Sequence, residues 1–222
     1  MLAISLWQPY LAGVLHGDAW CSNLTIGLRC KDRDFSQQFA ACINAGFARS
    51  VQPKRDERGY WLVRVGNKSG TFSALRAFVP KGDEAIAMWL RGLFDSEGNA
   101  QLWHMPHVSQ LSYHRRVAFY STAVHTLLTA SSYLTALAIP NTLRPTKNSA
   151  SHRGSKIVHE LRVVRREGFT RFASVVGSSI GRKDERLKLI ASTYQPAFDY
   201  QSRGGKAGTA TRLARAAKGE KY

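Results

Sequence analysis

Apolar positions recur along the chain in two helix-like runs that share a nine-residue pattern. The copies occupy residues 11–19 and 90–98, so they begin 90 − 11 = 79 residues apart. Both read apolar, any, Gly, apolar, apolar, any, small, acid, small. The small residues are Gly13 and Gly17 in the first copy, and Gly92 and Ser96 in the second. Since residues four apart share one face of a helix, the pattern predicts two helices that pack closely through these positions.

Each helix is followed by segments of strand-like alternation and by further amphipathic helices. In the first half we expect a short strand pair that includes 25–30, a helix at 34–45 that ends at Gly46, strands at 47–54 and 59–67, and a short helix at 70–78. In the second half we expect a helix at 84–96, a strand and long loop at 99–114, a strand near 117–120, a helix at 123–138, strands at 139–148 and 157–165, and helices at 168–180 and 183–194.

A second internal repeat supports the division into two halves. Leu161-Arg162-Val163 repeats Val63-Arg64-Val65 at an offset of 161 − 63 = 98 residues. Each half reads αββαββα, which predicts an α+β protein of two pseudo-symmetric repeats and an antiparallel β saddle, packed through the two motif helices. We expect an N-terminal repeat at 1–78, a linker at 79–83, a C-terminal repeat at 84–195 and a basic tail at 196–222.

Charge narrows the range of partners. The 222 residues include 32 Lys and Arg against 15 acids, a formal net charge of +17. Such an excess favours a polyanion, with nucleic acid the first candidate and an anionic membrane surface the second. No run approaches 18 apolar residues, and no basic leader precedes the apolar N-terminus, so neither a membrane span nor a signal peptide is expected. Three cysteines without a CxxC pair suit a reducing compartment. We therefore expect an intracellular protein, cytoplasmic, nucleoid-associated or organellar, that is not secreted.

The acids in the two copies are the candidate catalytic groups. Asp18 and Glu97 occupy the same position of the pattern, so packing of the two helices would bring them out side by side. Paired carboxylates on a basic chain indicate a divalent-metal site. Asp95, two residues before Glu97, is expected to be a surface or capping acid. His104, His107 and His114 lack an HExxH motif and a cysteine partner at zinc spacing, so DNA or solvent contacts are favoured over a zinc site.

The two copies, LAGVLHGDA and LRGLFDSEG, resemble the motif of the LAGLIDADG homing endonucleases in their single-chain form. The second copy matches closely through Asp95-Ser96-Glu97-Gly98, whereas the first departs at His16 and Ala19. The resemblance implies a monomer with two overlapping active sites, each cutting one DNA strand. It also implies carbonyl ligands at Ala19 and Gly98, and Mg²⁺ or Mn²⁺ as cofactor, with Ca²⁺ bound but not supporting cleavage. Many relatives carry a basic or amide residue near the position of Lys31, which makes Lys31 a third catalytic candidate.

An antiparallel ribbon can enter the major groove and present alternate side chains to base edges. The residues with outward parity are Arg29, Arg64, Arg116, Tyr120 and Arg162. Further candidates on strands of less certain parity are Gln52, Lys54, Asn141 and Arg144. These residues are the expected DNA contacts.

Together these observations favour an intron-encoded, metal-dependent endonuclease that cuts a long, partly asymmetric double-stranded DNA target. Two alternatives share the same fold: a group I intron RNA maturase, and a DNA-binding regulator that does not cleave. Both motif acids, Asp18 and Glu97, are present, and their presence favours the nuclease.

Overall fold

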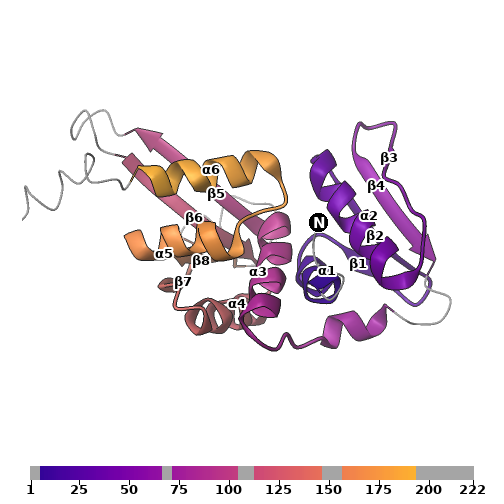
Figure 1. The fold of residues 1–222 in the computed structure, drawn as a ribbon, viewed down its shortest axis with the longest axis horizontal. Coiled ribbons are helices and arrows are strands. Elements are labelled where there is room, and N and C mark those ends of the chain that lie inside the picture. The colour runs from indigo at the N-terminus through magenta and orange to yellow at the C-terminus, as the bar shows by residue number, and fades with distance from the viewer. Residues whose placement is uncertain (1–5, 67–71, 105–112, 147–156, 194–222) are drawn as a thin grey trace, which may run out of the picture.

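Two helices, α1 (Trp7–Leu15) and α3 (Asp83–Glu97), lie side by side at the centre of the molecule, with one half of the chain on each side (Figure 1). This computed structural model describes residues 6–66, 72–104, 113–146 and 157–193. Both helices are buried along most of their length. Helix α1 begins at Trp7, and Pro9 lies in its first turn, where the missing N–H of proline costs little.

The N-terminal half packs one antiparallel sheet against helices. Its elements are β1 (Trp20–Cys21), β2 (Thr25–Cys30), α2 (Arg33–Phe47), β3 (Lys54–Arg55), β4 (Trp61–Gly66) and the 3₁₀ helix η2 (Ser73–Ala77). The strand order is β1-β2-β4-β3. Ile26 and Leu28 lie on the buried face, whereas Arg29 is exposed, and both apolar residues share a core with Phe39 of α2.

The C-terminal half repeats this plan and carries additional helices after its last strand. Its elements are β5 (Gly98–His104), β6 (Tyr113–Ser121), α4 (Val124–Ala136), β7 (Asn141–Pro145), β8 (His159–Val163), α5 (Arg166–Arg171), the π-helical turn η4 (Phe172–Val176) and α6 (Gly181–Ser192). The strand order β5-β6-β8-β7 is that of the first sheet. Hence the tripeptides that repeat at an offset of 98 lie on equivalent strands, β4 and β8, with Arg64 and Arg162 both next to buried neighbours.

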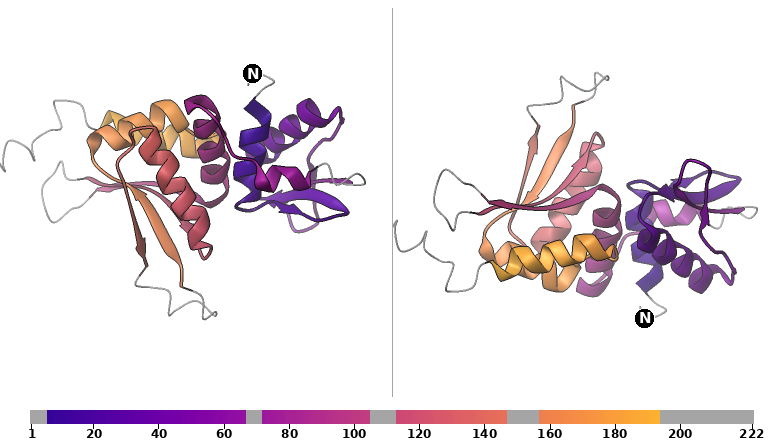
Figure 2. Two further views of the ribbon diagram at one scale, coloured as in Figure 1. Left: turned by 90° about the horizontal axis from the view of Figure 1, so that it is seen from below. Right: turned by 90° about the horizontal axis from the view of Figure 1, so that it is seen from above.

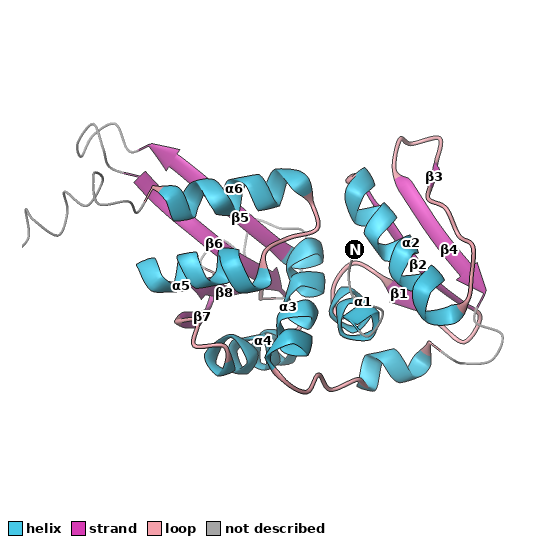
Figure 3. Cartoon of the chain, in the orientation of Figure 1, coloured by secondary structure: helices cyan, strands magenta, loops and turns pink. Residues whose placement is uncertain are grey.

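In each sheet one face is covered and the other is open. Val117, Phe119, Leu161 and Val163 form one core with residues of α3, α4 and α6. Further views show the helices of each half packed against its sheet (Figure 2), and colouring by secondary structure shows the two sheets on either side of the α1–α3 pair (Figure 3). The predicted α+β fold is therefore confirmed. In the described ranges no helix is long and apolar enough to cross a bilayer.

Packing changes two of the expected helix ends. Gly46 does not end α2, which runs to Phe47 and is followed by Ala48 with a φ of 47°. Gly46 instead lies against Trp7, whose ring would overlap an added Cβ. The helix expected at 168–180 ends earlier, because it passes into the π-helical turn and stops before Gly177 with a φ of 61°. The expected basic tail lies outside the described residues.

Candidate active site and nucleic-acid interface

Glycines allow the backbones of α1 and α3 to touch. A Cβ added at Gly13 would overlap the carbonyl oxygen of Trp89, and one added at Gly92 would overlap the carbonyl oxygen of Tyr10. Each helix thus presents a glycine to a carbonyl of the other helix. A side chain at either position would force the helices apart, because backbone atoms cannot move aside as a flexible side chain can.

This close approach brings the two motif acids to the same end of the helix pair. Asp18 lies exposed in the turn that follows α1, and Glu97 is the half-buried last residue of α3. A Cβ added at Gly17 would lie 3.1 Å from Cγ of Glu97 and would overlap the side chain of Ser96. The Glu97 side chain therefore lies against the backbone that leads into Asp18.

The electrostatics of this end disfavour two negative charges. Burial, and then the charge of Asp18, raise the pKa of Glu97 to about 7. Although the Asp18 side chain is partly open to solvent, desolvation of its carboxyl by the surrounding protein also raises its pKa, and the charge of Lys183 lowers the pKa of both carboxyls. A cation bound between Asp18 and Glu97 would relieve this cost by favouring the charged forms.

Lys183 was not among the sequence candidates, yet it is the buried cation beside the acids. It belongs to α6, is 7% exposed, and donates hydrogen bonds of 2.9 Å to the carbonyl of Phe94 and 2.8 Å to that of Asp95. These carbonyls belong to the last turn of α3, where the helix dipole is negative and a cation is favourable. Burial lowers the pKa of Lys183 to about 8. No local signal marks this lysine, because 183 − 97 = 86 residues separate it from Glu97.

Asp95 is not the surface or capping acid that the sequence suggested. It is 2% exposed and accepts hydrogen bonds from the Tyr10 hydroxyl at 2.8 Å, from the Ser178 hydroxyl, and from the Ser179 backbone N–H at 3.2 Å. It therefore joins α1, α3 and the segment before α6. Burial raises the pKa of Asp95, and these hydrogen bonds oppose that shift.

The start of α6 also contacts the N-terminal half. Arg182 makes a two-point ion pair with Asp32, at 2.7 and 2.8 Å, and the Gly181 N–H donates to Asp34 at 2.6 Å. Asp32 and Asp34 flank the first residue of α2. The residue after Arg182 is Lys183, so this contact joins the two halves immediately beside the candidate active site.

Asp18 and Glu97 can hold a divalent ion whose remaining ligands are water molecules and substrate oxygens. Asp18 and Glu97 supply two hard carboxylate groups, and the carbonyls of Ala19 and Gly98 directly follow them in the chain. Within the described ranges no group of three or more His, Cys, Asp or Glu side chains converges on a metal position. Mg²⁺ is commonly bound through one or two carboxylates together with water and phosphate oxygens. The donor set therefore fits Mg²⁺ or Mn²⁺ better than a fully protein-ligated ion such as structural zinc.

Lys31 lies away from this charge network. It follows β2, is exposed, and its ammonium lies 5.7 Å from the centroid of the Tyr60 ring. The cation whose charge acts on both Asp18 and Glu97 is Lys183. A direct catalytic contribution from Lys31 stays a prediction.

The open face of the N-terminal sheet gathers four of the expected DNA contacts. Arg29 pairs with Asp56 at 2.7 Å and stacks on the Tyr60 ring, whose centroid is 4.4 Å away. A depression of about 370 Å³ on this half is lined by Ser50, Val51, Gln52, Lys54, Leu62 and Arg64. Thus Arg64 of β4 lies together with Gln52 and Lys54, which come from β3 and the residues just before it. Their contact with DNA stays a prediction.

The open face of the C-terminal sheet gathers a second group of expected contacts around an acid. Glu160 of β8 is 1% exposed, and it is surrounded by Arg116, Arg144, Arg162 and Tyr120. Cross-strand pairing explains the grouping, because Tyr120 and Arg144 are the direct partners of Glu160 on β6 and β7. The neighbouring Trp103 and His114 side chains stack with ring centroids 4.1 Å apart. The side chains of His104 and His107 lie outside the described part of the chain.

Asn141 does not belong to this open face, and its expected role as a DNA contact is corrected. It is the partner of Val163, whose side chain is in the core. The Asn141 amide bonds to the Ser131 hydroxyl at 2.6 Å and to the Ile139 carbonyl at 3.0 Å. The residue therefore attaches β7 to α4. Strand parity around Pro140 and Pro145 was ambiguous in the sequence, and only the pairing with β8 settles it.

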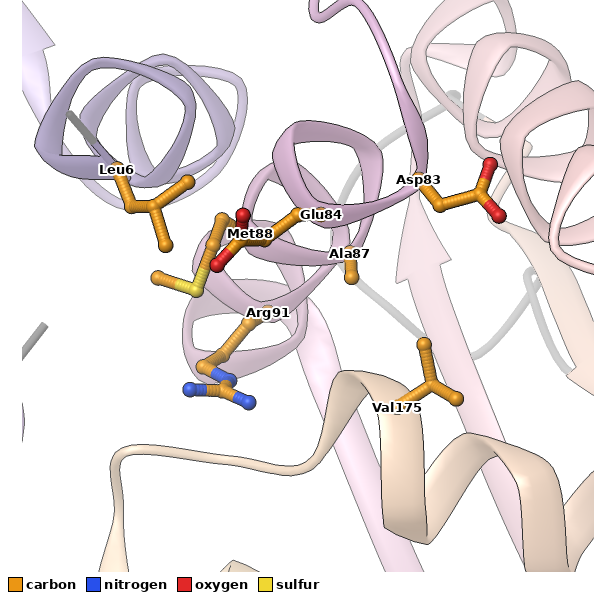
Figure 4. Close-up of a pocket in the computed structure, with 7 residues that line it drawn as sticks. All are labelled: Leu6, Asp83, Glu84, Ala87, Met88, Arg91 and Val175. Atoms are coloured by element: carbon orange, nitrogen blue, oxygen red, sulfur yellow. The ribbon is translucent and has the colours of Figure 1, made fainter. Parts of the chain in front are cut away.

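A second hollow lies at the opposite end of α3 and does not take part in the candidate active site. It has a volume of about 300 Å³ and is lined by Leu6, Asp83, Glu84, Ala87, Met88, Arg91 and Val175 (Figure 4). Asp83 and Glu97 are the first and last residues of α3. At 1.5 Å per residue the two ends are roughly 20 Å apart.

Comparison with known proteins finds a family match in the second half of the chain and a fold match over most of the chain. Residues 84–177 match the model of the LAGLIDADG-like domain. An uncharacterized protein of Methanocaldococcus jannaschii is 30% identical over a match that covers 40% of each chain. The chain thus matches less than half the length of that relative.

Solved structures share the two-lobed fold. A structure of mesophilic variants of the homing endonuclease I-DmoI matches with a TM-score of 0.55 and 15% identity, over 78% of this chain and 96% of that chain. Full-length DUF199/WhiA from Thermatoga maritima matches with a TM-score of 0.60 and 14% identity, over 97% of this chain and 70% of that chain. These likenesses establish the fold, and the domain match applies to residues 84–177. The LAGLIDADG-like domain thus covers residues 84–177, and the two-helix fold of the whole chain is similar to that of I-DmoI and DUF199/WhiA.

Proposed function

We propose that this protein is a site-specific double-strand DNA endonuclease that hydrolyses one phosphodiester on each strand with divalent metal ions. The observation that carries the proposal is the pair of acids Asp18 and Glu97. They lie at one end of a glycine-packed helix pair, with the pKa of Glu97 raised by burial and by Asp18. Negative charges at the C-terminal end of a helix are unfavourable, so these two carboxylates do not serve helix stability. Their pairing is instead what a metal site requires.

Different residues of the protein have different roles in the proposed hydrolysis. Asp18 and Glu97 would hold a divalent ion, which would supply a water of lowered pKa and offset charge on the phosphate and the leaving oxygen. Glu97 must be ionised to do so. Lys183 fixes the last carbonyls of α3 and so holds the backbone from which Glu97 extends. Lys31 is proposed to stabilise charge that develops on the phosphate.

Binding is assigned to the open faces of the two sheets. A net charge of +17 favours a polyanion, and arginines lie on both open faces, at Arg29, Arg64, Arg116, Arg144 and Arg162. The two faces carry different side chains, so the proposed target is long and only partly symmetric. Since one chain carries both motif helices, a monomer would suffice to cut both strands.

The related structures support DNA and divalent metal as partners. I-DmoI has been solved in complex with DNA and Mn, and in complex with DNA and Ca. A variant of I-DmoI has also been solved with its target DNA in the presence of Mg. We propose that this chain likewise uses Mg²⁺ or Mn²⁺, with intron homing as the biological setting.

The test is selection of cleaved sites from a random DNA library with Mg²⁺, followed by cleavage of the selected site in a plasmid. Changing Asp18→Asn together with Glu97→Gln is expected to abolish cleavage and to leave binding largely intact. The matched control is Asp83→Asn with Glu84→Gln, which removes the same charge at the opposite end of α3 and should still cut. Unchanged cutting by the Asp18 and Glu97 double variant would refute the proposal.

Two other functions would give different results in the same experiments. An RNA maturase would restore intron splicing without cutting DNA. A regulator that does not cleave would select DNA by binding and would leave it intact with any divalent ion. The presence of both Asp18 and Glu97 favours the nuclease over both.

A further inference from the structure

Glu160 is a buried carboxylate in the middle of a surface that is otherwise built for a polyanion. It lies on the open face of the C-terminal sheet, yet it is only 1% exposed, because three arginines and a tyrosine cover it. An acid in a DNA-binding face repels phosphate and costs desolvation. We therefore expect Glu160 to have a function that compensates for this repulsion and desolvation cost.

The hydrogen bonds around Glu160 fix the guanidinium groups of two different strands. Oε1 accepts from Arg116 Nε at 2.7 Å, and Oε2 accepts from Arg144 Nε at 3.0 Å and Nη2 at 2.9 Å. Arg162 Nε lies 3.4 Å from Oε1, and the Tyr120 hydroxyl donates to Oε1 at 3.0 Å. Burial alone would raise the pKa of Glu160, but the hydrogen bonds from Arg144 and Arg116 hold it below its usual value. The carboxylate therefore stays charged at neutral pH.

The arginines keep donors for a second partner. A guanidinium has five N–H donors, and Arg144 commits two of them to Glu160. The side chains of Arg116, Arg144 and Arg162 are 26%, 54% and 24% exposed, so all three also reach solvent. Three cations thus outnumber the single anion that they surround. An arginine held by a carboxylate loses less rotamer entropy when it binds than a free arginine does.

We propose that Glu160 is a positioning residue for base recognition: it orients Arg116, Arg144 and Arg162 toward guanine bases in the half of the DNA target that lies under the C-terminal sheet. Guanine is the base that fits, because it presents two acceptors, N7 and O6, in the major groove, and arginine can bind both. This inference rests on the proposed DNA-binding function. Beyond that function, the inference names guanine as the recognised base, the C-terminal sheet as the recognising surface and Glu160 as the residue that orients its arginines.

The N-terminal sheet provides an internal comparison. There Arg29 pairs with Asp56, an acid whose side chain is 23% exposed, in a single ion pair. An acid orients one arginine on the N-terminal sheet but three on the C-terminal sheet. We therefore expect the DNA half-site under the C-terminal sheet to show the stronger preference for guanine.

The experiment is selection of bound sites from random double-stranded DNA in EDTA, so that cleavage cannot contribute. The wild-type protein should enrich guanine at two or more positions of one half-site. Glu160→Gln keeps the shape of the side chain and should lower that preference about fivefold or more at each position. Affinity for unrelated DNA should be maintained or increased, because a negative charge has been removed. Asp56→Asn, the matched control, should leave those positions unchanged.

Each outcome decides between the two proposals. If the wild-type protein enriches no sequence, the DNA-binding function fails and the role of Glu160 fails with it. If it enriches a site and Glu160→Gln shows the same base preference, the role of Glu160 is refuted and the DNA-binding function stands. If Glu160→Gln does not fold, Arg144→Lys replaces it, since that variant keeps the charge but loses the two-point contact. Unchanged guanine preference in Arg144→Lys would also refute the inference.

Discussion

The hydroxyl of Tyr10 in α1 donates a 2.8 Å hydrogen bond to the buried carboxylate of Asp95 in α3. The same carboxylate accepts from Ser178 and from the N–H of Ser179. The bond thus crosses the interface between the two halves and ties it to the segment that carries Lys183. The helix pair is held by polar contacts as well as by the packing of its glycines.

Replacing Tyr10 by Phe should lower the free energy of unfolding by about 1 kcal/mol, since one hydrogen bond is lost and Asp95 keeps two other partners. Asp95→Ala should cost more, about 1–3 kcal/mol, because it leaves buried donors unpaired. Urea unfolding measures both. Tyr60→Phe, on the open N-terminal face, is the control and should change stability little. Equal costs for Tyr10→Phe and Asp95→Ala would contradict this account.

Gly13→Ala should destabilise the protein by about 1–3 kcal/mol or more, because the new methyl group would overlap the Trp89 carbonyl. Gly92→Ala should do the same through the Tyr10 carbonyl. Gly66→Ala is the matched control, since nothing lies within 4 Å of a Cβ there. Thermal and urea unfolding give the comparison. A Gly13→Ala variant as stable as Gly66→Ala would show that the helices are not in backbone contact.

Divalent-ion binding should weaken as the pH falls through about 7. The raised pKa of Glu97, about 7 in the folded protein, means that the carboxylate is mostly protonated at pH 6 and mostly ionised at pH 8. Apparent Mg²⁺ affinity should therefore be about tenfold higher at pH 8. Calorimetric titration with Mg²⁺ at the two pH values measures the difference.

The same group links pH to stability. A carboxyl whose pKa is raised on folding favours the folded state at low pH, and this contribution is lost as the pH rises from the unfolded value through about 7. Mg²⁺ should offset that loss, so it should raise Tm more at pH 8 than at pH 6. In Glu97→Gln both pH effects should largely disappear. Their persistence would assign them to another group.

Lys183→Met should remove the donor to the carbonyls of Phe94 and Asp95 and reduce stability by about 1–3 kcal/mol. We also expect the single-turnover cleavage rate to fall more than DNA affinity, because the backbone that carries Glu97 would be less fixed. The control on the same helix is Lys188→Met, since Lys188 is 72% exposed and its pair with Asp184 is worth little. A loss of DNA affinity as large as the loss of rate would argue against this positioning role.

The repeated pattern along the chain was sufficient for the architecture. The spacing of Gly13 and Gly92 predicted the helix pair, and the alternation around Arg64 and Arg162 predicted which strand faces are buried. These features are local, because helix and strand periods place neighbouring residues on known faces. Strand lengths and helix ends were less accurate, as the continuation of α2 past Gly46 shows.

Three charged groups, Lys183, Asp95 and Glu160, gain their roles only when the chain is folded. Two of them meet partners far away in the chain: the Asp95–Tyr10 bond spans 85 residues, and the Lys183 bond to Phe94 spans 89. The amino-acid pattern was enough to predict the fold, the two motif acids and a basic chain suited to nucleic acid. Which charges are buried together follows only from the packing of the halves, because burial and pKa depend on contacts between elements rather than on the period within one element.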